Sequence, residues 1–228
     1  MIGIIGAMSV EIEKIQGEIQ NPVSKVISGI TYISGMIYEQ EVVVAICGIG
    51  KVFAAICAQT MILEYKPDGI INVGVAGTLT AEIGITDIAV ADCLVQHDMD
   101  TSPIGDPLGL ISGINIIQIP CDKELVSKIT ASLMQLEMKG LVGTIASGDQ
   151  FVATPEKRKF IKDQFQAIAC EMEGAAIAQV CYVNEVPCGV IRSISDSADD
   201  SADMDYPTFM QLAAQRSFTL IMAFLKAY

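Results

Sequence analysis

Two segments of the chain are apolar at nearly every position, so both faces of each must be buried. They are IGIIGA at residues 2–7 and GIINVGVAG at residues 69–77. Strands of this kind are typical of parallel sheets that helices cover on both sides. Segments with a helical spacing of apolar residues alternate with the strands along the chain. We therefore predict an α/β fold with a mixed, mostly parallel central β-sheet flanked by helices.

Local signals predict the other elements. The apolar residues of 9–20 recur at a helical spacing, with Ser9 as the predicted N-cap. Residues 31–48 predict a β-hairpin that turns near Glu39–Gln40 and makes the sheet mixed. Asp122 is the predicted cap of a later helix. Further helices are predicted at 51–66, 122–138, 155–165, 173–184 and 206–228, and further strands at 85–96, 167–170, 186–196 and the start of 140–151.

Composition limits the classes of partner. The chain has 228 residues, of which 51% are hydrophobic and 18% charged, as expected of a globular chain with a large core. No linker or composition break divides it, so we expect one domain over residues 1–228. The net charge of −13 makes nucleic acid and an anionic membrane surface poor partners.

Cysteine and histidine usage bears on compartment and metal. Seven cysteines are scattered without a CxxC pair, and there is one histidine. This pattern favours a reducing compartment and shows no spacing that would hold zinc, so we expect neither a metal nor another cofactor. The N-terminal MIGIIGAM lacks a basic region and a long apolar core, and no apolar run reaches the roughly 18 residues of a membrane span. We expect a cytoplasmic protein.

Polar residues gather where the predicted strands end. In open α/β sheets, ligands bind beyond the carboxyl ends of the strands. Candidate site residues should therefore come from the segments AMSVE, CGIGK, VGVAG, SGDQF, CEME and RSISDSAD.

Two motifs invite a chemical interpretation that their details do not support. CGIGKV at 47–52 has no third glycine, because Phe53 stands in its place, and Val52 follows Lys51 where a phosphate loop needs Ser or Thr. A tight strand-to-helix turn beside a pocket is the better interpretation. HDMD at 97–100 offers one imidazole and two carboxylates, and we favour a loop or subunit contact over a metal site.

The acids at the strand ends allow both structural and functional interpretations. Glu171 and Glu173 flank a predicted helix start, where a carboxylate complements the helix dipole or holds a polar ligand. Glu11 falls in the first turn of a helix, and Asp196 ends a buried strand as a turn residue or a catalytic acid. Arg192 lies on that apolar strand, where a charge is costly unless it is paired or used.

Together these segments resemble the family of 5′-methylthioadenosine/S-adenosylhomocysteine nucleosidases, within the nucleoside phosphorylase superfamily. The matching stretches are IGIIGAMSVE, GIGKV, INVGVAG, SGDQF, EMEGAAIAQVC and VPCGVIRSISDSAD. They occur in order over residues 2–199. The resemblance implies the three-layer nucleoside phosphorylase-like fold, a nucleoside substrate and a homodimer with a partner loop near the pocket.

The resemblance also implies roles for three acids. Glu11 would activate the attacking water, and Asp196 would face the purine. Glu173 would hold the ribose hydroxyls, which leaves Glu171 as a structural residue. The implied reaction is hydrolysis of the N-glycosidic bond of 5′-methylthioadenosine and S-adenosylhomocysteine, in methionine salvage and methyl-cycle recycling.

The same resemblance implies the pocket walls. Met172 would lie against the sugar, Phe151 would stack on the base, and Val152 would contact the base through its backbone. Arg192 and Ser195 would complete the surroundings. The aromatic residue expected to close over the sugar is Tyr206, which aligns less well.

Two departures from the family pattern concern substrate and water. Val75 stands in GVAG where relatives often have Ser, so a hydroxyl that could help hold the water is missing. The loop HDMDTSPIGDPLG lacks the aromatic residues of the commoner version, which puts the preferred 5′ substituent in doubt. Three hypotheses follow: a hydrolase for these or other 5′-substituted adenosines, a phosphorolytic enzyme, and a nucleoside-binding module that has lost activity.

The chemistry of glycosidic cleavage explains why separate acids are needed. The base must leave as a neutral species while the sugar tolerates oxocarbenium character. Asp196 could protonate the purine at N7 near neutral pH if burial raised its pKa. Glu11 would instead have to be ionised to accept a proton from water. Phosphorolysis would need cationic groups around the phosphate, and two of the three arginines, Arg158 and Arg216, fall in predicted helices.

Overall fold

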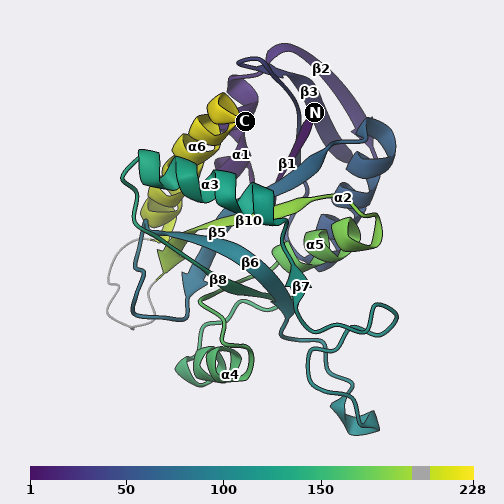
Figure 1. Ribbon diagram of the computed structural model, residues 1–228, viewed down its shortest axis with the longest axis vertical. Helices are drawn as coiled ribbons and strands as arrows, with labels where there is room; N and C mark the ends of the chain where they lie inside the picture. Colours follow the sequence, from purple (N-terminus) through teal and green to yellow (C-terminus); the bar gives the residue numbers. More distant parts are fainter. Residues whose placement is uncertain (197–205) are drawn as a thin grey trace.

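The computed structural model describes residues 1–196 and 206–228, and the side chains of the second range from residue 208 onward (Figure 1). In chain order its elements are β1 (Ile2–Gly6), α1 (Ser9–Gly17), β2 (Gln20–Ile27), β3 (Ile30–Ile37), β4 (Gln40–Ile46), α2 (Lys51–Tyr65), β5 (Gly69–Thr78), β6 (Ile88–Gln96), the 3-10 helix η1 (Ser102–Ile104), β7 (Ile119–Pro120), α3 (Lys123–Gln135), β8 (Gly140–Ser147), α4 (Pro155–Phe165), β9 (Ala169–Glu171), α5 (Gly174–Val183), β10 (Cys188–Asp196) and α6 (Tyr206–Ala227).

The described strands form one mixed sheet. Its order is β10-β6-β8-β9-β5-β1-β4-β3-β2, with β7 beside β6. Strand β10 also pairs with β5, so the sheet curls until these strands close into a ring. Parallel pairs join β4, β1, β5 and β10 in the centre, and β6, β8 and β9 beside them. The carboxyl ends of β1, β4, β5 and β10 therefore lie at the same edge.

The sheet is mixed, as predicted, and its central strands are parallel. Its pairings divide evenly, with five parallel and five antiparallel. The predicted hairpin of β3 and β4 accounts for one antiparallel pair, and the edge strand β2 adds another. The short strands β7 and β9 and the β10–β6 closure supply the rest.

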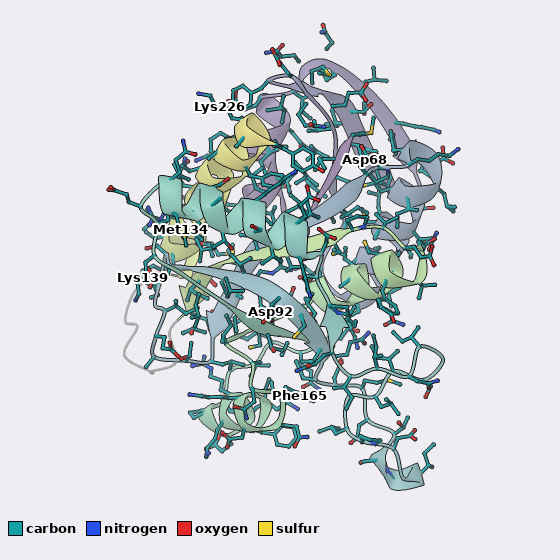
Figure 2. All side chains as sticks on the ribbon, viewed as in Figure 1. Asp68, Asp92, Met134, Lys139, Phe165 and Lys226 are labelled. Carbon is teal, nitrogen blue, oxygen red and sulfur yellow. The ribbon has the colours of Figure 1, made fainter. Side chains whose placement is uncertain are left out.

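Helices cover both faces of the sheet (Figure 1). Helices α1, α3 and α6 pack together on one face, over a core that includes Ile4, Ile12 and Leu220. Helices α2 and α5 lie side by side on the other face. Helix α4 packs against β8 through Phe165, which is labelled in Figure 2 and is 5% exposed. The predicted α/β fold is confirmed.

Strand β2 was not predicted, and the first helix is shorter than predicted. Helix α1 ends at Gly17, and the chain enters β2 at Gln20. All but one residue of β2 are exposed because it is an edge strand, so no alternating apolar pattern marks it. Ser9 is not the N-cap either, because Met8 holds that position. By contrast, Asp122 caps α3 as predicted, accepting a hydrogen bond from Leu125 N at 2.9 Å.

Among the described residues, no helix combines the length and the apolarity needed to cross a membrane.

Candidate active site

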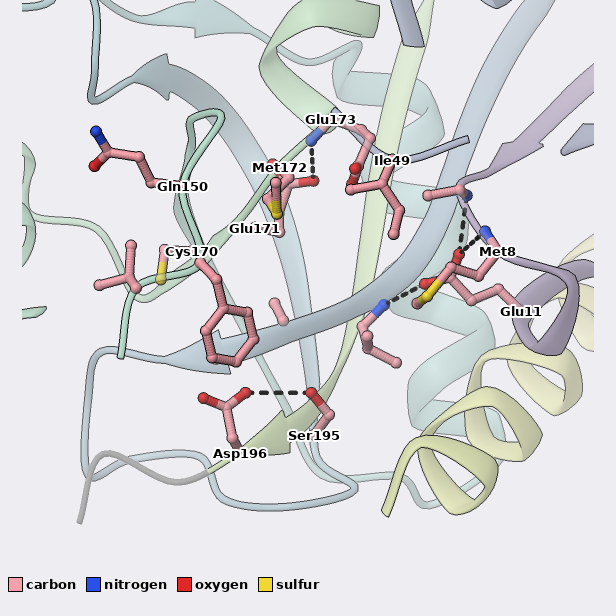
Figure 3. Close-up of a pocket in the computed structure, with 16 residues that line it drawn as sticks. Met8, Glu11, Ile49, Gln150, Cys170, Glu171, Met172, Glu173, Ser195 and Asp196 are labelled. Atoms are coloured by element: carbon pink, nitrogen blue, oxygen red, sulfur yellow. Dashed lines mark hydrogen bonds between the residues drawn. The ribbon is translucent and has the colours of Figure 1, made fainter. Parts of the chain in front are cut away.

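A cavity opens at the shared edge where the central strands end (Figure 3). Counting its open mouth, it holds about 700 Å³, which is within the usual range of small-molecule sites. All six segments singled out at the strand ends contribute a lining residue. In order they are Glu11, Ile49, Val75, Phe151, Glu173 and Asp196.

Glu11 is held by backbone donors on both of its oxygens. Its Oε2 accepts from Ala7 N and Met8 N, each at 2.9 Å, and its Oε1 accepts from Val75 N at 3.1 Å. The side chain is 4% exposed. Burial raises the pKa of Glu11, while Arg192 and the three N–H donors oppose the shift. A carboxylate with a raised pKa is a stronger base. Glu11 therefore both closes the first turn of α1 and presents a fixed acceptor to the cavity.

Glu171 and Arg192 form a buried ion pair beneath the cavity. Their side chains are 3% and 1% exposed, and Arg192 Nη2 contacts Glu171 Oε2. Arg192 Nη1 also donates to the backbone oxygen of Ile191 at 2.9 Å. Glu171 accepts from Glu173 N at 3.0 Å and from Gly174 N, so it caps the start of α5. Although burial opposes its charge, Arg192 and these donors hold the pKa of Glu171 below its usual range. The structural interpretation of Glu171 agrees with this geometry.

Glu173 lacks the cation that Glu171 has. Its Oε1 accepts from Gly50 N at 2.8 Å, and the side chain lines the cavity. Burial and the neighbouring charge of Glu171 raise the pKa of Glu173 to about 7. The two acids differ because the guanidinium of Arg192 bonds to Glu171 and not to Glu173. Of the two acids in CEME, Glu173 is thus the one available to a ligand.

The raised pKa of Glu173 predicts a pH dependence. The ionised carboxylate accepts hydrogen bonds from two hydroxyl groups more strongly than the protonated acid does, and a raised pKa leaves more of the carboxyl group protonated below pH 7. The ratio kcat/KM reports the free enzyme, so it should rise with pH through about 7. Profiles of the wild type and of Glu173→Gln check this. The variant should lose this rise, and an unchanged midpoint would assign the rise to another group.

Asp196 ends β10 on another side of the cavity from Glu11 (Figure 3). Ser195 Oγ donates to its Oδ1 at 3.2 Å, and Arg158 Nη2 lies 3.5 Å from its Oδ2. Burial raises the pKa of Asp196, while Ser195 and Arg158 oppose the shift. Burial thus favours the protonated form of this carboxyl, and the cation of Arg158 lies nearby to stabilise the carboxylate that forms when it gives up a proton.

Two glycines of β5 allow both acids to approach that strand. A Cβ at Gly74 would lie 2.9 Å from Glu11 Oε1, and a Cβ at Gly77 would lie 2.8 Å from Asp196 Oδ2. Neither position tolerates a side chain without moving an acid. The two glycines are three residue steps apart along the strand, which is about 10 Å. Glu11 and Asp196 thus approach the same strand, at Gly74 and at Gly77.

Apolar side chains form the other walls. Phe151, Val152 and Met172 line the cavity, and Phe151 is 69% exposed. Val75 lines the cavity too. It lacks the hydroxyl of the serine that relatives often have at this position, but its backbone N–H donates to Glu11. Met8 and Ile49 were not predicted to be site residues. Both lie within segments singled out at the strand ends, Met8 in AMSVE and Ile49 in CGIGK, and that position could have indicated them.

Two candidate residues are not placed in the cavity wall. Arg192 is not among the lining residues, because its guanidinium is fully engaged behind Glu171. Its place is therefore beneath the site rather than against a ligand. Tyr206 begins α6, but its side chain lies outside the described residues. Arg158 was placed on a helix without a role, and no local signal could have shown that it faces Asp196.

The described residues contain no cluster of His, Cys, Asp and Glu that could hold a metal ion. In HDMD, Asp98 instead forms an ion pair with Lys51 at 2.7 Å.

The buried ion pair predicts a loss of stability. Replacing Glu171 by alanine leaves the Arg192 charge buried without its partner, which should lower the free energy of unfolding by about 3–5 kcal/mol. Urea unfolding monitored by circular dichroism measures the loss. Asp163→Ala is the control, since it removes a carboxylate from the exposed ion pair with Lys159 and should change little. Equal stability of both variants would contradict the structural importance of Glu171.

Comparison with known proteins identifies the relatives of the chain. The model of the Phosphorylase superfamily matches residues 1–226. A 5′-methylthioadenosine/S-adenosylhomocysteine nucleosidase of Shewanella sediminis is 38% identical over 99% of this chain and 98% of its own length. A mutant of the Helicobacter pylori enzyme of that activity, with 5′-methylthioadenosine in its active site, has a TM-score of 0.94 and 36% identity over 100% of this chain and 98% of its own. The structure of Helicobacter pylori futalosine hydrolase has a TM-score of 0.93 and 36% identity over 100% and 97%.

The fold, the cavity at the strand ends and the match over nearly the whole chain define a protein of the phosphorylase superfamily. This agrees with the resemblance seen in the sequence motifs. Within the superfamily, the chain belongs to the family of 5′-methylthioadenosine/S-adenosylhomocysteine nucleosidases.

Proposed function

We propose that this protein hydrolyses the N-glycosidic bond of 5′-methylthioadenosine and S-adenosylhomocysteine, releasing adenine and the 5-substituted ribose. One observation carries the proposal above the others. Glu11, Glu173 and Asp196 line a single cavity, and each has a different environment and set of partners. Its biological role would be methionine salvage and recycling of the methyl cycle.

The three environments match three tasks. Glu11, fixed by three N–H donors, takes a proton from the attacking water. Asp196, with its raised pKa, donates a proton to purine N7 so that adenine leaves as a neutral base. Glu173 accepts hydrogen bonds from the ribose hydroxyls, and its charge favours the developing oxocarbenium ion. The apolar surfaces of Phe151 and Met172 would lie against the base and the sugar.

Phosphorolysis is disfavoured by the charge of the cavity. Among the described residues that line it, none is a lysine or an arginine, whereas four are acidic. A phosphate ion would meet repulsion there rather than a cationic clamp. The third hypothesis, a binding module without activity, is disfavoured because both candidate catalytic acids are present and ordered by hydrogen bonds.

An adenine-release assay tests the function directly. The protein should release adenine and a free reducing sugar from 5′-methylthioadenosine in phosphate-free buffer. Added phosphate should neither accelerate the reaction nor yield a sugar 1-phosphate. Binding without adenine release would instead support the module without activity.

The 5′ substituent that the site prefers calls for a panel of substrates. Met8, Ile49 and Met172 give the cavity an apolar side, which suits a thioether. The similar structure of Helicobacter pylori futalosine hydrolase is the reason to include futalosine in the panel. We expect 5′-methylthioadenosine to be preferred over 5′-deoxyadenosine and futalosine. A comparison of kcat/KM across the panel decides among them.

We also propose a cytoplasmic homodimer. The seven cysteines are all free, which suits a reducing compartment. The paired helices α2 and α5 expose apolar side chains, namely Val52, Phe53, Ile56, Tyr182 and Val183. Such a patch is typical of a protein interface. Light scattering should give the mass of a dimer, and Val183→Asp should lower it to that of a monomer.

A further inference from the structure

Three residues singled out in the sequence motifs have no part in the proposed chemistry. Lys51 closes CGIGK after β4, Asp98 lies in HDMD after β6, and Asp149 lies in SGDQF after β8. None of the three lines the cavity. They come from loops that are far apart in sequence, yet the structure brings them together.

The three residues close a ring of hydrogen bonds. Lys51 Nζ donates to Asp98 Oδ1 at 2.7 Å. Asp98 Oδ2 accepts from Asp149 N at 2.9 Å, and Asp149 Oδ1 accepts from Lys51 N at 2.8 Å. Each residue thus contacts both others. Lys51 Nζ also donates to Gln96 Oε1 at 3.0 Å, which ties the ring to the end of β6.

The ring is partly sheltered from water. The side chains of Lys51 and Asp98 are 19% and 16% exposed, so solvent screens their attraction less than on an open surface. Burial opposes the charge of Asp98, but Lys51 and the Asp149 N–H outweigh it and hold its pKa below the usual value. Asp98 therefore stays ionised and able to accept both bonds.

Two loops of the cavity begin directly at this ring. One residue before Lys51, Gly50 donates its N–H to Glu173. Two residues after Asp149, Phe151 lines the cavity, followed by Val152. The ring thus sets the ribose-side loop and the base-side loop in register with each other. A displacement of about 1 Å in such a site can cost a hundredfold in rate.

We propose that Lys51, Asp98 and Asp149 act as a latch that positions the ribose-side and base-side loops relative to each other. They are positioning residues, which act through Gly50 and Phe151 without touching the substrate. This proposal rests on the proposed function for the division of the cavity into a ribose side and a base side.

A double-mutant cycle tests the latch. Lys51→Met and Asp98→Ala should each lower kcat/KM for 5′-methylthioadenosine by about tenfold. The double variant should lose no more than the worse single variant, because breaking either side opens the same ring. Lys51→Arg should restore part of the loss. Asp100→Ala, an exposed acid in the same loop, is the control and should behave as the wild type.

Amide hydrogen exchange gives a readout that does not depend on activity. In Asp98→Ala, exchange should accelerate in the peptides around residues 47–53 and 147–153, which do not contain the substitution, while helix α3 stays protected. Unchanged exchange there, or losses in kcat/KM that multiply in the double variant, would overturn the latch. If the wild type binds the nucleoside without cleaving it, the proposed function fails, and the exchange experiment still decides the latch.

Discussion

The Glu11→Gln variant is expected to bind 5′-methylthioadenosine but to lose turnover by about 10³-fold, within the usual contribution of a general base. Glutamine has nearly the shape of glutamate but cannot accept the proton of water. Its amide nitrogen would also face a backbone N–H, because Ala7 N, Met8 N and Val75 N occupy both oxygens of Glu11. The main effect of the substitution should therefore be the loss of the base, and a smaller effect should be some loss of order in the first turn of α1.

Adenine release and calorimetric titration together measure this effect. Glu13→Gln is the matched control, because Glu13 lies two residues further along α1 and is exposed. It should keep wild-type turnover. A Glu11→Gln variant that cleaves within a few-fold of the wild type would remove Glu11 as the base. A variant that no longer binds the nucleoside would show that Glu11 serves mainly to shape the cavity.

The position of the acids could be predicted because it follows from a rule of topology. Strands apolar on both faces predict a covered parallel sheet, and the carboxyl ends of parallel strands gather at one edge. Glu11 follows β1 and Asp196 ends β10, so these two acids were expected at one edge before their contacts were known. Glu173 follows β9, which pairs with β5 in the antiparallel sense, so the rule alone does not place it beside them. The glycines of VGVAG, which let two of these acids approach β5, belong to the same edge.

The division of labour between Glu171 and Glu173 depends on partners distant in sequence. Both acids lie at the junction of β9 and α5, and local pattern suits either one as a helix-capping residue. Arg192, 21 residues further on, decides between them by pairing with Glu171. The charge of Arg192 on an apolar strand predicted that it would be paired or used, but not which acid it would meet.

Contacts between residues of different loops cannot be predicted from the periodicity of apolar residues. Helix α4 was predicted at residues 155–165, with Pro155 in its first turn, yet nothing local shows that Arg158 faces Asp196. The ring of Lys51, Asp98 and Asp149 was likewise divided among three motifs. The edge strand β2 was not predicted for a local reason. It is exposed on both faces, so it lacks the apolar alternation that marks a strand.

Replacing Asp196 by asparagine should preserve the fold and nucleoside binding. It should lower turnover by about 10²-fold or more, which is the usual contribution of general acid catalysis. Asparagine can still donate a hydrogen bond to purine N7, but it cannot transfer a proton, so adenine would have to leave as an anion. The raised pKa of Asp196 sets the direction of the pH effect. As pH rises through that pKa, the wild type loses its proton donor and its turnover falls.

The asparagine variant separates this acid from every other titrating group. It has no proton to lose at this position, so the alkaline fall in turnover should disappear from its pH profile while a lower, flat rate remains. Asp163→Asn, at an exposed position on α4, should retain both the rate and the fall. If Asp196→Asn keeps the alkaline fall, another group donates the proton. If the variant also keeps near-normal turnover, the purine leaves without a proton from Asp196. The assignment of an ionised Glu11 and a protonated Asp196 is then wrong.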